Sequence, residues 1–138
     1  MAHKAGSFCW SELHTTDVAK SKPFYAAVLG WTYKEMPMPG AEPGVYGMPQ
    51  VDGKDAAGMG GMPPGTPKGT PPHWSLYVAV DDVDATVKKA NELGGKTLMP
   101  SFDIPNIGRM AVIQDPTGGV ISLWWKGGHA GVAADATK

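Results

Sequence analysis

The residues best suited to chemistry lie near the N-terminus, in the segment "WSELH" at 10–14. If this segment forms a β-strand, alternate side chains project from one face, so Trp10, Glu12 and His14 share one side of the sheet. An indole, a carboxylate and an imidazole on one face are compatible with a metal site, an acid–base site or a polar wall. Cys9 falls on the opposite face, where we interpret its thiol as buried and unreactive.

Length and charge restrict the elements that can carry this face. The chain has 138 residues, which predicts one domain over about 1–126, followed by a flexible tail at 127–138. Twelve basic and thirteen acidic side chains nearly cancel, so we expect neither nucleic acid nor a membrane as a partner. The single cysteine and the absence of an apolar leader favour a cytoplasmic setting.

An internal repeat indicates how the domain is organised. The segment "SELHTTDVAKS" at 11–21 resembles "LYVAVDDVDAT" at 76–86, and each reads as a strand, an Asp-Val pair and a helix. Asp17 and Asp82 are suitable caps for the two helices, because a carboxylate can accept hydrogen bonds from the free amides of a first turn. The helices end at "VLGW" and "ELGG", where glycine permits a left-handed cap.

Short apolar runs follow each helix and are separated by turn-forming residues. The repeat therefore predicts two βαβββ modules, at about 7–62 and 73–126, joined by a proline- and glycine-rich connector at 60–73. The predicted strands lie at 8–15, 32–36, 45–51 and 56–62 in the first module, and at 74–80, 96–99, 109–114 and 120–125 in the second.

These paired modules, the "FY…LGW" helix end and the "DPTGG" turn before an apolar strand resemble the vicinal oxygen chelate superfamily. That superfamily includes glyoxalase I, extradiol dioxygenases, fosfomycin-resistance enzymes and bleomycin-binding proteins. The chain is most similar to its glyoxalase-like "hydroxylase" and mycobacterial antigen branch, whose members often carry two such domains in tandem. The resemblance implies an α+β fold in which two modules form an eight-stranded curved cup, with the helices outside and a ligand in the concave interior.

The resemblance also implies where a metal would be bound. Metal-dependent members place His, Gln or Glu at fixed spacings from the aspartate that ends the first strand of each module and from the aspartate of the "DP" turn. Those positions hold Trp10, Ser75 and Ser122 here, and the strand at 56–62 offers only alanine, glycine and methionine. Because divalent catalysis needs several imidazole or carboxylate donors, we predict no metal and no other cofactor. An unconventional site made by Glu12, His14 and His73 remains the alternative.

Strand alternation defines the expected cavity wall. Leu76 and Leu123 belong to apolar faces suited to the helices, which leaves the opposite face of each strand inward. The predicted ligand-binding residues are Trp10, Glu12, Ser75, Tyr77, Ser122 and Trp124. His14, His73 and Arg109 are predicted at the rim, where Arg109 either pairs with an anion or forms a structural ion pair.

Two functions are compatible with this wall. Aromatic residues beside vacant metal positions favour a protein that binds a small, partly aromatic or apolar molecule without a metal. The alternative is a metal-independent enzyme of the lyase or isomerase type, with Glu12 as general acid or base and Tyr77 or a serine as its helper. Exposed strand edges and the single-domain length predict a homodimer.

Overall fold

The computed structural model describes residues 3–37, 45–63, 65–104 and 107–125. The described residues form nine β-strands and two α-helices. The chain divides into two compact units, which we call the first unit (Trp10–Ser75) and the second unit (Met1–Cys9 with Leu76–Lys138). The predicted tail at 127–138 lies outside the described residues.

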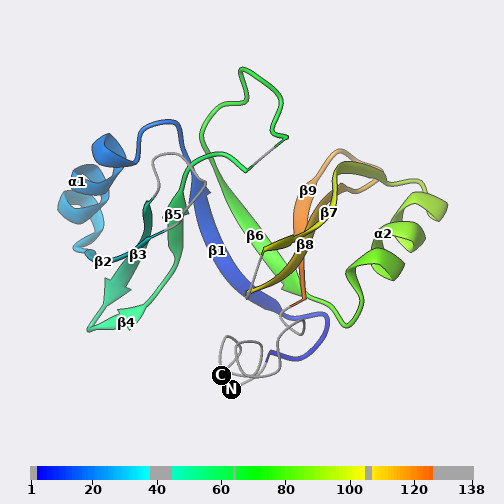
Figure 1. The fold of residues 1–138 in the computed structure, drawn as a ribbon, viewed down its shortest axis with the longest axis horizontal. Helices are drawn as coiled ribbons and strands as arrows, with labels where there is room; N and C mark the ends of the chain where they lie inside the picture. The colour runs from blue at the N-terminus through cyan, green and yellow to red at the C-terminus, as the bar shows by residue number, and fades with distance from the viewer. Residues whose placement is uncertain (1–2, 38–44, 64, 105–106, 126–138) are drawn as a thin grey trace. The chain divides into compact units, whose positions relative to one another are not determined.

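The first unit contains one helix and a small mixed sheet (Figure 1). Its sheet has the order β2-β3-β5-β1, and the short strand β4 pairs with β3. Strands β1 and β5 run parallel, with Glu12 opposite Gly58 and Leu13 opposite Met59. The element bounds are β1 Phe8–His14, α1 Val18–Leu29, β2 Thr32–Pro37, β3 Val45–Val51, β4 Lys54–Asp55 and β5 Gly58–Gly60.

Helix α1 begins and ends as the sequence predicts. The Asp17 side chain accepts a hydrogen bond from the Lys20 amide at 3.0 Å, and Gly30 closes the helix with a φ of 75°. The helix packs on the sheet through a buried core formed by Leu13, Val18 and Met59. Leu13 therefore faces the helix, and strand alternation places Trp10, Glu12 and His14 on the opposite face of β1.

The second unit repeats this plan. The end of β6 also pairs with the start of the chain, because the Ala79 amide donates to the Ser7 carbonyl at 2.9 Å. Its strand order is β6-β9-β8-β7, with β6 and β9 parallel. The bounds are β6 His73–Ala79, α2 Val83–Glu92, β7 Lys96–Ile104, β8 Gly108–Gln114 and β9 Val120–Trp125.

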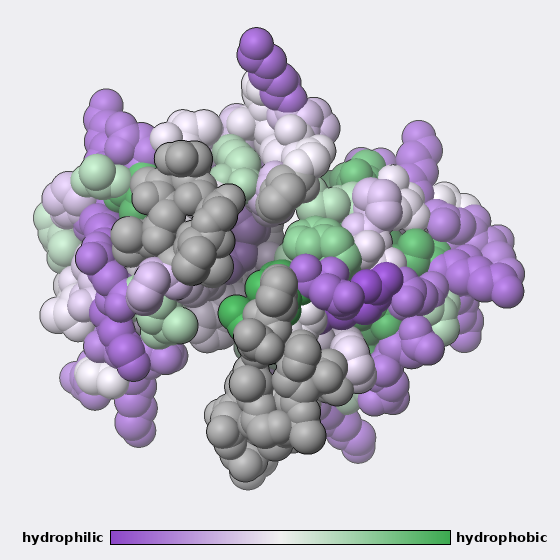
Figure 2. Space-filling view, viewed as in Figure 1, coloured by the Kyte–Doolittle hydropathy of each residue, from purple (hydrophilic) through white to green (hydrophobic). Residues whose placement is uncertain are grey.

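Helix α2 covers one face of this second sheet. Asp82 caps it by accepting a hydrogen bond from the Ala85 amide at 3.0 Å, and Val83 forms a buried core with Ala111 and Leu123. The prediction that Leu123 faces the helix is therefore confirmed. Figure 2 shows hydrophilic residues over the outer side of α2, as expected for a helix with one buried face.

The predicted fold class of two βαβββ modules is confirmed, with small differences in the strands. The expected strand at 56–62 is reduced to the three residues of β5, and β4 is an additional strand of two residues. Strand β7 instead extends through Pro100 to Ile104. Proline is tolerated there because β7 is at the edge of its sheet and its register shifts between Met99 and Phe102.

The connector between β5 and β6 contains turns in its described residues. The Thr66 amide donates to the Pro63 carbonyl at 3.1 Å, and the Thr70 amide donates to the Pro67 carbonyl at 3.2 Å. Neither helix in the described part of the chain has both the length and the apolar character needed to cross a membrane.

Candidate functional site

The face of β1 that carries Trp10, Glu12 and His14 is a connected polar network in the first unit. The indole Nε1 of Trp10 donates a hydrogen bond to the Tyr46 hydroxyl at 3.0 Å. That hydroxyl in turn donates to Oε2 of Glu12, whose Oε1 lies 3.1 Å from Nε2 of His14. Side-chain contacts therefore connect Trp10, Glu12 and His14, and Tyr46 provides the link between Trp10 and Glu12. The sequence pattern did not single out Tyr46.

Two glycines in β5 make room for the Tyr46 ring. A Cβ atom at Gly58 would overlap the hydroxyl oxygen and Cζ of Tyr46 and would approach Nε1 of Trp10 to 2.9 Å. A Cβ atom at Gly60 would lie 3.2 Å from Cδ1 of the same ring. The sequence signal for this site was the "GMG" of β5, because glycine inside a strand often marks a close approach by another group.

The network is shielded from solvent without being closed to it. The side chain of Glu12 is 14% exposed and that of His14 is 7% exposed, while Trp10 and Tyr46 are half-buried. Burial raises the pKa of Tyr46 far above its ordinary value, and the adjacent Glu12 charge raises it further. Tyr46 is therefore a neutral hydrogen-bond donor to Glu12 over the whole physiological pH range.

The two predicted rim histidines are neighbours. The rings of His14 and His73 have centroids 5.6 Å apart, and His14 is buried whereas His73 is exposed. Nδ1 of His14 lies 3.4 Å from the Gly61 carbonyl oxygen, and Nδ1 of His73 lies 2.8 Å from that of Pro71. Each ring is thus oriented by a backbone carbonyl of the connector.

The predicted site residues of the second unit lie around an aromatic pair. Tyr77 and Trp124 meet edge to face with centroids 6.3 Å apart, and the Tyr77 hydroxyl lies 3.9 Å from Sδ of Met110. Ser122 is buried and pairs with Tyr77 between β9 and β6. Gly108 gives the Trp124 indole its space, because a Cβ atom there would lie 2.8 Å from Cζ2 of that ring.

Ser75 is half-buried near the start of β6 in the first unit. Arg109, in the second unit, forms structural ion pairs. Its Nη1 donates to Asp103 at 2.9 Å and its Nη2 to Asp84 at 3.0 Å. Because Asp84 lies in the first turn of α2, these bonds connect that helix to β7 and β8.

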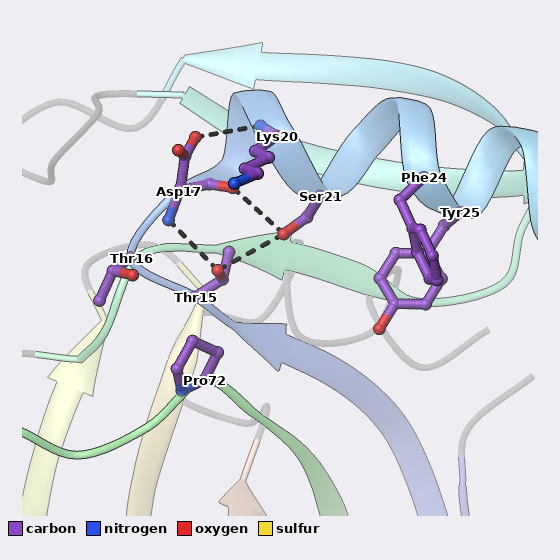
Figure 3. Close-up of a pocket in the computed structure, with 8 residues that line it drawn as sticks. All are labelled: Thr15, Thr16, Asp17, Lys20, Ser21, Phe24, Tyr25 and Pro72. Carbon is purple, nitrogen blue, oxygen red and sulfur yellow. Dashed lines mark hydrogen bonds between the residues drawn. The ribbon is translucent and has the colours of Figure 1, made fainter.

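An open pocket of about 560 Å³ lies at the N-terminal end of α1 (Figure 3). Its lining residues are Thr15, Thr16, Asp17, Lys20, Ser21, Phe24, Tyr25 and Pro72. The buried Thr15 hydroxyl lies 3.2 Å from the Asp17 amide and 3.4 Å from the Ser21 hydroxyl. Several polar groups of this pocket are therefore engaged in fastening the start of α1 to the end of β1.

The superfamily's metal-ligand positions carry side chains that do not fit a divalent metal. Across the described ranges, no cluster of three or more His, Cys, Asp or Glu side chains is arranged to hold an ion. The superfamily positions identified from the sequence carry an indole and two hydroxyls, and Glu12 is engaged by Tyr46 and His14. Neutral hydroxyl and indole groups cannot replace the charged or imidazole ligands that such ions require.

The fold agrees with the results of comparison with known proteins. The chain matches the model of the Glyoxalase/Bleomycin resistance protein/Dioxygenase superfamily over residues 8–123, and it belongs to that superfamily. A solved superfamily member from Vibrio splendidus 12B01 has the same fold, with a TM-score of 0.54 and 20% identity. That match covers 86% of this chain and 99% of the solved chain.

Two curated relatives are more similar in sequence. CFP32 of Mycobacterium tuberculosis (strain CDC 1551 / Oshkosh), which carries a provisional glyoxylase designation, is 46% identical over 129 residues. The anthracycline biosynthesis protein DnrV of Streptomyces peucetius is 36% identical over 133 residues. The matches cover 94% and 88% of this chain but only 49% and 48% of the relatives. The chain thus spans about half the length of the curated relatives it matches.

Proposed function

We propose that this chain binds a flat, partly aromatic or apolar small molecule on the face formed by Trp10, Glu12 and Tyr46, and that it does so without a bound metal. The observation that carries the proposal is the hydrogen bond from Tyr46 to Glu12. It joins the Glu12 carboxylate to the Tyr46 hydroxyl, which also accepts a hydrogen bond from the Trp10 indole, on a half-buried face. Such a surface offers apolar contact area together with a fixed polar group that can orient a ligand.

The chemistry of Glu12 narrows the class of ligand. A carboxylate on a shielded face favours a cation or a hydrogen-bond donor over an anion, because a second negative charge would be poorly solvated there. The relative DnrV is named for anthracycline biosynthesis, and anthracyclines are flat polycyclic molecules that carry hydroxyl and amino groups. We therefore propose a planar polycyclic ligand with a hydroxyl or amino substituent.

The binding proposal is tested with daunorubicin, an anthracycline that carries an amine. Isothermal titration should detect saturable binding, and Trp10→Ala should weaken it about threefold to tenfold through loss of an aromatic contact. Trp31→Ala is the matched control, because Trp31 packs on Tyr25 and Trp74. If the wild-type chain shows no saturable binding, anthracycline-like molecules are excluded as ligands. If Trp10→Ala and Trp31→Ala lose the same affinity, Trp10 is not the residue that contacts the ligand.

A second candidate function is metal-independent acid–base catalysis of the lyase or isomerase type by Glu12. It is favoured by the 3.1 Å contact between Glu12 and His14, because an adjacent imidazole can exchange a proton with a carboxylate. In this enzyme Tyr46 would take the helper role that the sequence suggested for Tyr77. Glu12→Gln separates the two functions, since it should abolish turnover of a substrate but only alter the affinity of a bound ligand.

We also propose a cellular location and an oligomeric state. In this proposal the protein is cytoplasmic, forms a homodimer and binds neither nucleic acid nor membranes. The near balance of twelve basic and thirteen acidic residues supports the absence of polyanionic partners. Strand β2, at the edge of its sheet in the first unit, supports pairing with a second copy.

A further inference from the structure

The Tyr46 ring crosses β5 at Gly58, where a Cβ atom would overlap the tyrosine hydroxyl. Strand β5 lies between β3, which carries Tyr46, and β1, which carries Glu12. A side chain on β5 would ordinarily separate these two residues, but position 58 is glycine and sits opposite Glu12 in the β1–β5 pair. The missing side chain is thus the reason that a hydroxyl on β3 reaches a carboxylate two strands away.

This hydroxyl has two defined partners. It accepts a hydrogen bond from Trp10 at 3.0 Å and donates its own proton to Oε2 of Glu12. The Glu12 carboxylate is therefore held at one oxygen by Tyr46, while its other oxygen lies 3.1 Å from His14. A carboxylate contacted at both oxygens has a fixed plane, and donation from a neutral hydroxyl favours its ionised form.

We propose that Tyr46 is a positioning residue that holds Glu12 ionised and correctly oriented for the ligand, and that Gly58 is the residue that admits Tyr46 to this position. The role in ligand orientation rests on the proposed binding function. The contacts between Tyr46, Glu12 and Gly58 do not depend on it. The two parts are therefore measured separately, one on the ligand-free chain and the other with daunorubicin.

The first measurement is the titration of Glu12 by carbon NMR on glutamate-labelled, ligand-free protein. The chain has four glutamates, and Glu12→Gln identifies the signal of interest. Tyr46→Phe removes only the donor hydroxyl, so the pKa of Glu12 should rise by about 0.5–1 unit relative to wild type. Gly58→Ala should produce a similar rise by displacing the hydroxyl. If Gly58→Ala does not fold, Tyr46→Phe alone decides the outcome.

Tyr33→Phe is the matched control, because its hydroxyl donates to the Lys22 carbonyl at 2.8 Å in the same unit. It removes one tyrosine hydrogen bond without touching the Trp10–Glu12 face. The Glu12 titration should remain unchanged in this variant. Equal titrations of Glu12 in Tyr46→Phe and Tyr33→Phe would overturn the positioning role.

The second measurement is daunorubicin affinity, which should fall about threefold to tenfold in Tyr46→Phe and stay constant in Tyr33→Phe. Unchanged affinity in Tyr46→Phe would overturn its role in orienting the ligand. If daunorubicin fails to bind even the wild-type chain while the Glu12 titration shifts as expected, the proposed binding function fails and the positioning of Glu12 stands.

Discussion

The Tyr46 hydroxyl donates a hydrogen bond to the Glu12 carboxylate across the intervening strand β5. The two residues are 34 positions apart in the chain. A carboxylate on a half-buried face needs hydrogen-bond partners to offset the loss of water. Tyr46 and His14 are such partners of Glu12.

Because the Tyr46 ring lies directly over Gly58, substitution of this glycine should reduce the stability of the protein. We expect Gly58→Ala to lower the free energy of unfolding by about 1–3 kcal/mol, because the new methyl group overlaps the Tyr46 hydroxyl. Urea denaturation followed by circular dichroism measures this change. Gly60→Ala, whose Cβ atom lies 3.2 Å from Cδ1 of the same ring, should cost less. Wild-type stability in Gly58→Ala would show that the ring moves aside freely.

The pKa of Tyr46 predicts how stability changes at alkaline pH. Burial and the Glu12 charge raise this pKa above the ordinary value of 10.0. The unfolded chain releases the proton near that value while the folded chain retains it, so the free energy of unfolding should fall as the pH rises above it.

The variant Glu12→Gln should lower the Tyr46 pKa, because it removes the neighbouring charge. Urea unfolding at alkaline pH measures the effect, because a smaller rise of the Tyr46 pKa should give a smaller loss of stability in Glu12→Gln than in wild type. Glu35→Gln removes an exposed carboxylate paired with Lys22 and should lose stability as wild type does. The same alkaline loss in wild type and Glu12→Gln would argue against the contact.

The ion pairs of Arg109 predict an acid-sensitive contribution from Asp84. The Ser101 hydroxyl and the Arg109 guanidinium lower the pKa of Asp84 below 3.8. Its stabilising effect is therefore present above that value and is lost as the pH falls through the lowered pKa. We expect Asp84→Asn to be less stable than wild type at neutral pH and to converge with it in acid.

Urea unfolding of wild type and Asp84→Asn at neutral pH and in acid measures this difference in stability. Asp81→Asn is the control, since Asp81 is an exposed aspartate just before α2 and outside the Ser101–Arg109 network. Salt should reduce the difference between Asp84→Asn and wild type, because exposed ion pairs are screened. A constant difference across the acid range would contradict the assignment.

The donor set predicts a low metal content. Protein purified without an affinity tag should contain less than about one tenth of an equivalent of zinc, nickel, iron or manganese, because too few charged protein ligands converge to hold an ion tightly. Elemental analysis after dialysis gives this value. Near-stoichiometric metal that disappears in Glu12→Ala or His14→Ala would instead establish an unconventional site at these residues.

The position of β2 at the end of the strand order in the described residues supports the prediction of a homodimer. Sedimentation at micromolar concentration should give about twice the mass of one chain, 14.5 kDa. A proline in place of Lys34 on β2 would remove a backbone donor and should weaken association if this edge is used. Proline in place of Thr97 on β7 tests the other sheet edge in the same way. A single monomeric species at all concentrations would rule the dimer out.

Local signals in the sequence were sufficient for most of the fold. The caps at Asp17 and Asp82, the left-handed glycines Gly30 and Gly94 at the helix ends and the strand alternation around Leu13 and Leu123 depend on residues close together in the chain. The predicted strand at 96–99 is shorter than β7, because proline is among the turn-forming residues that separate the predicted strands. A proline can lie within an edge strand where the hydrogen-bond register shifts, because no backbone donor is needed there. The position of β7 at the edge is known only from the strand order.

The shared face of Trp10, Glu12 and His14 can be predicted from sequence alone, because side-chain direction in a strand follows from its period of two residues. The partner that links them follows from the packing of distant segments. Strand order places Tyr46 across β5, and the absence of a side chain at Gly58 leaves its ring room to reach Glu12. Alternation specifies the side of the sheet to which a residue points, whereas the identity of its neighbours depends on register and strand order between distant segments.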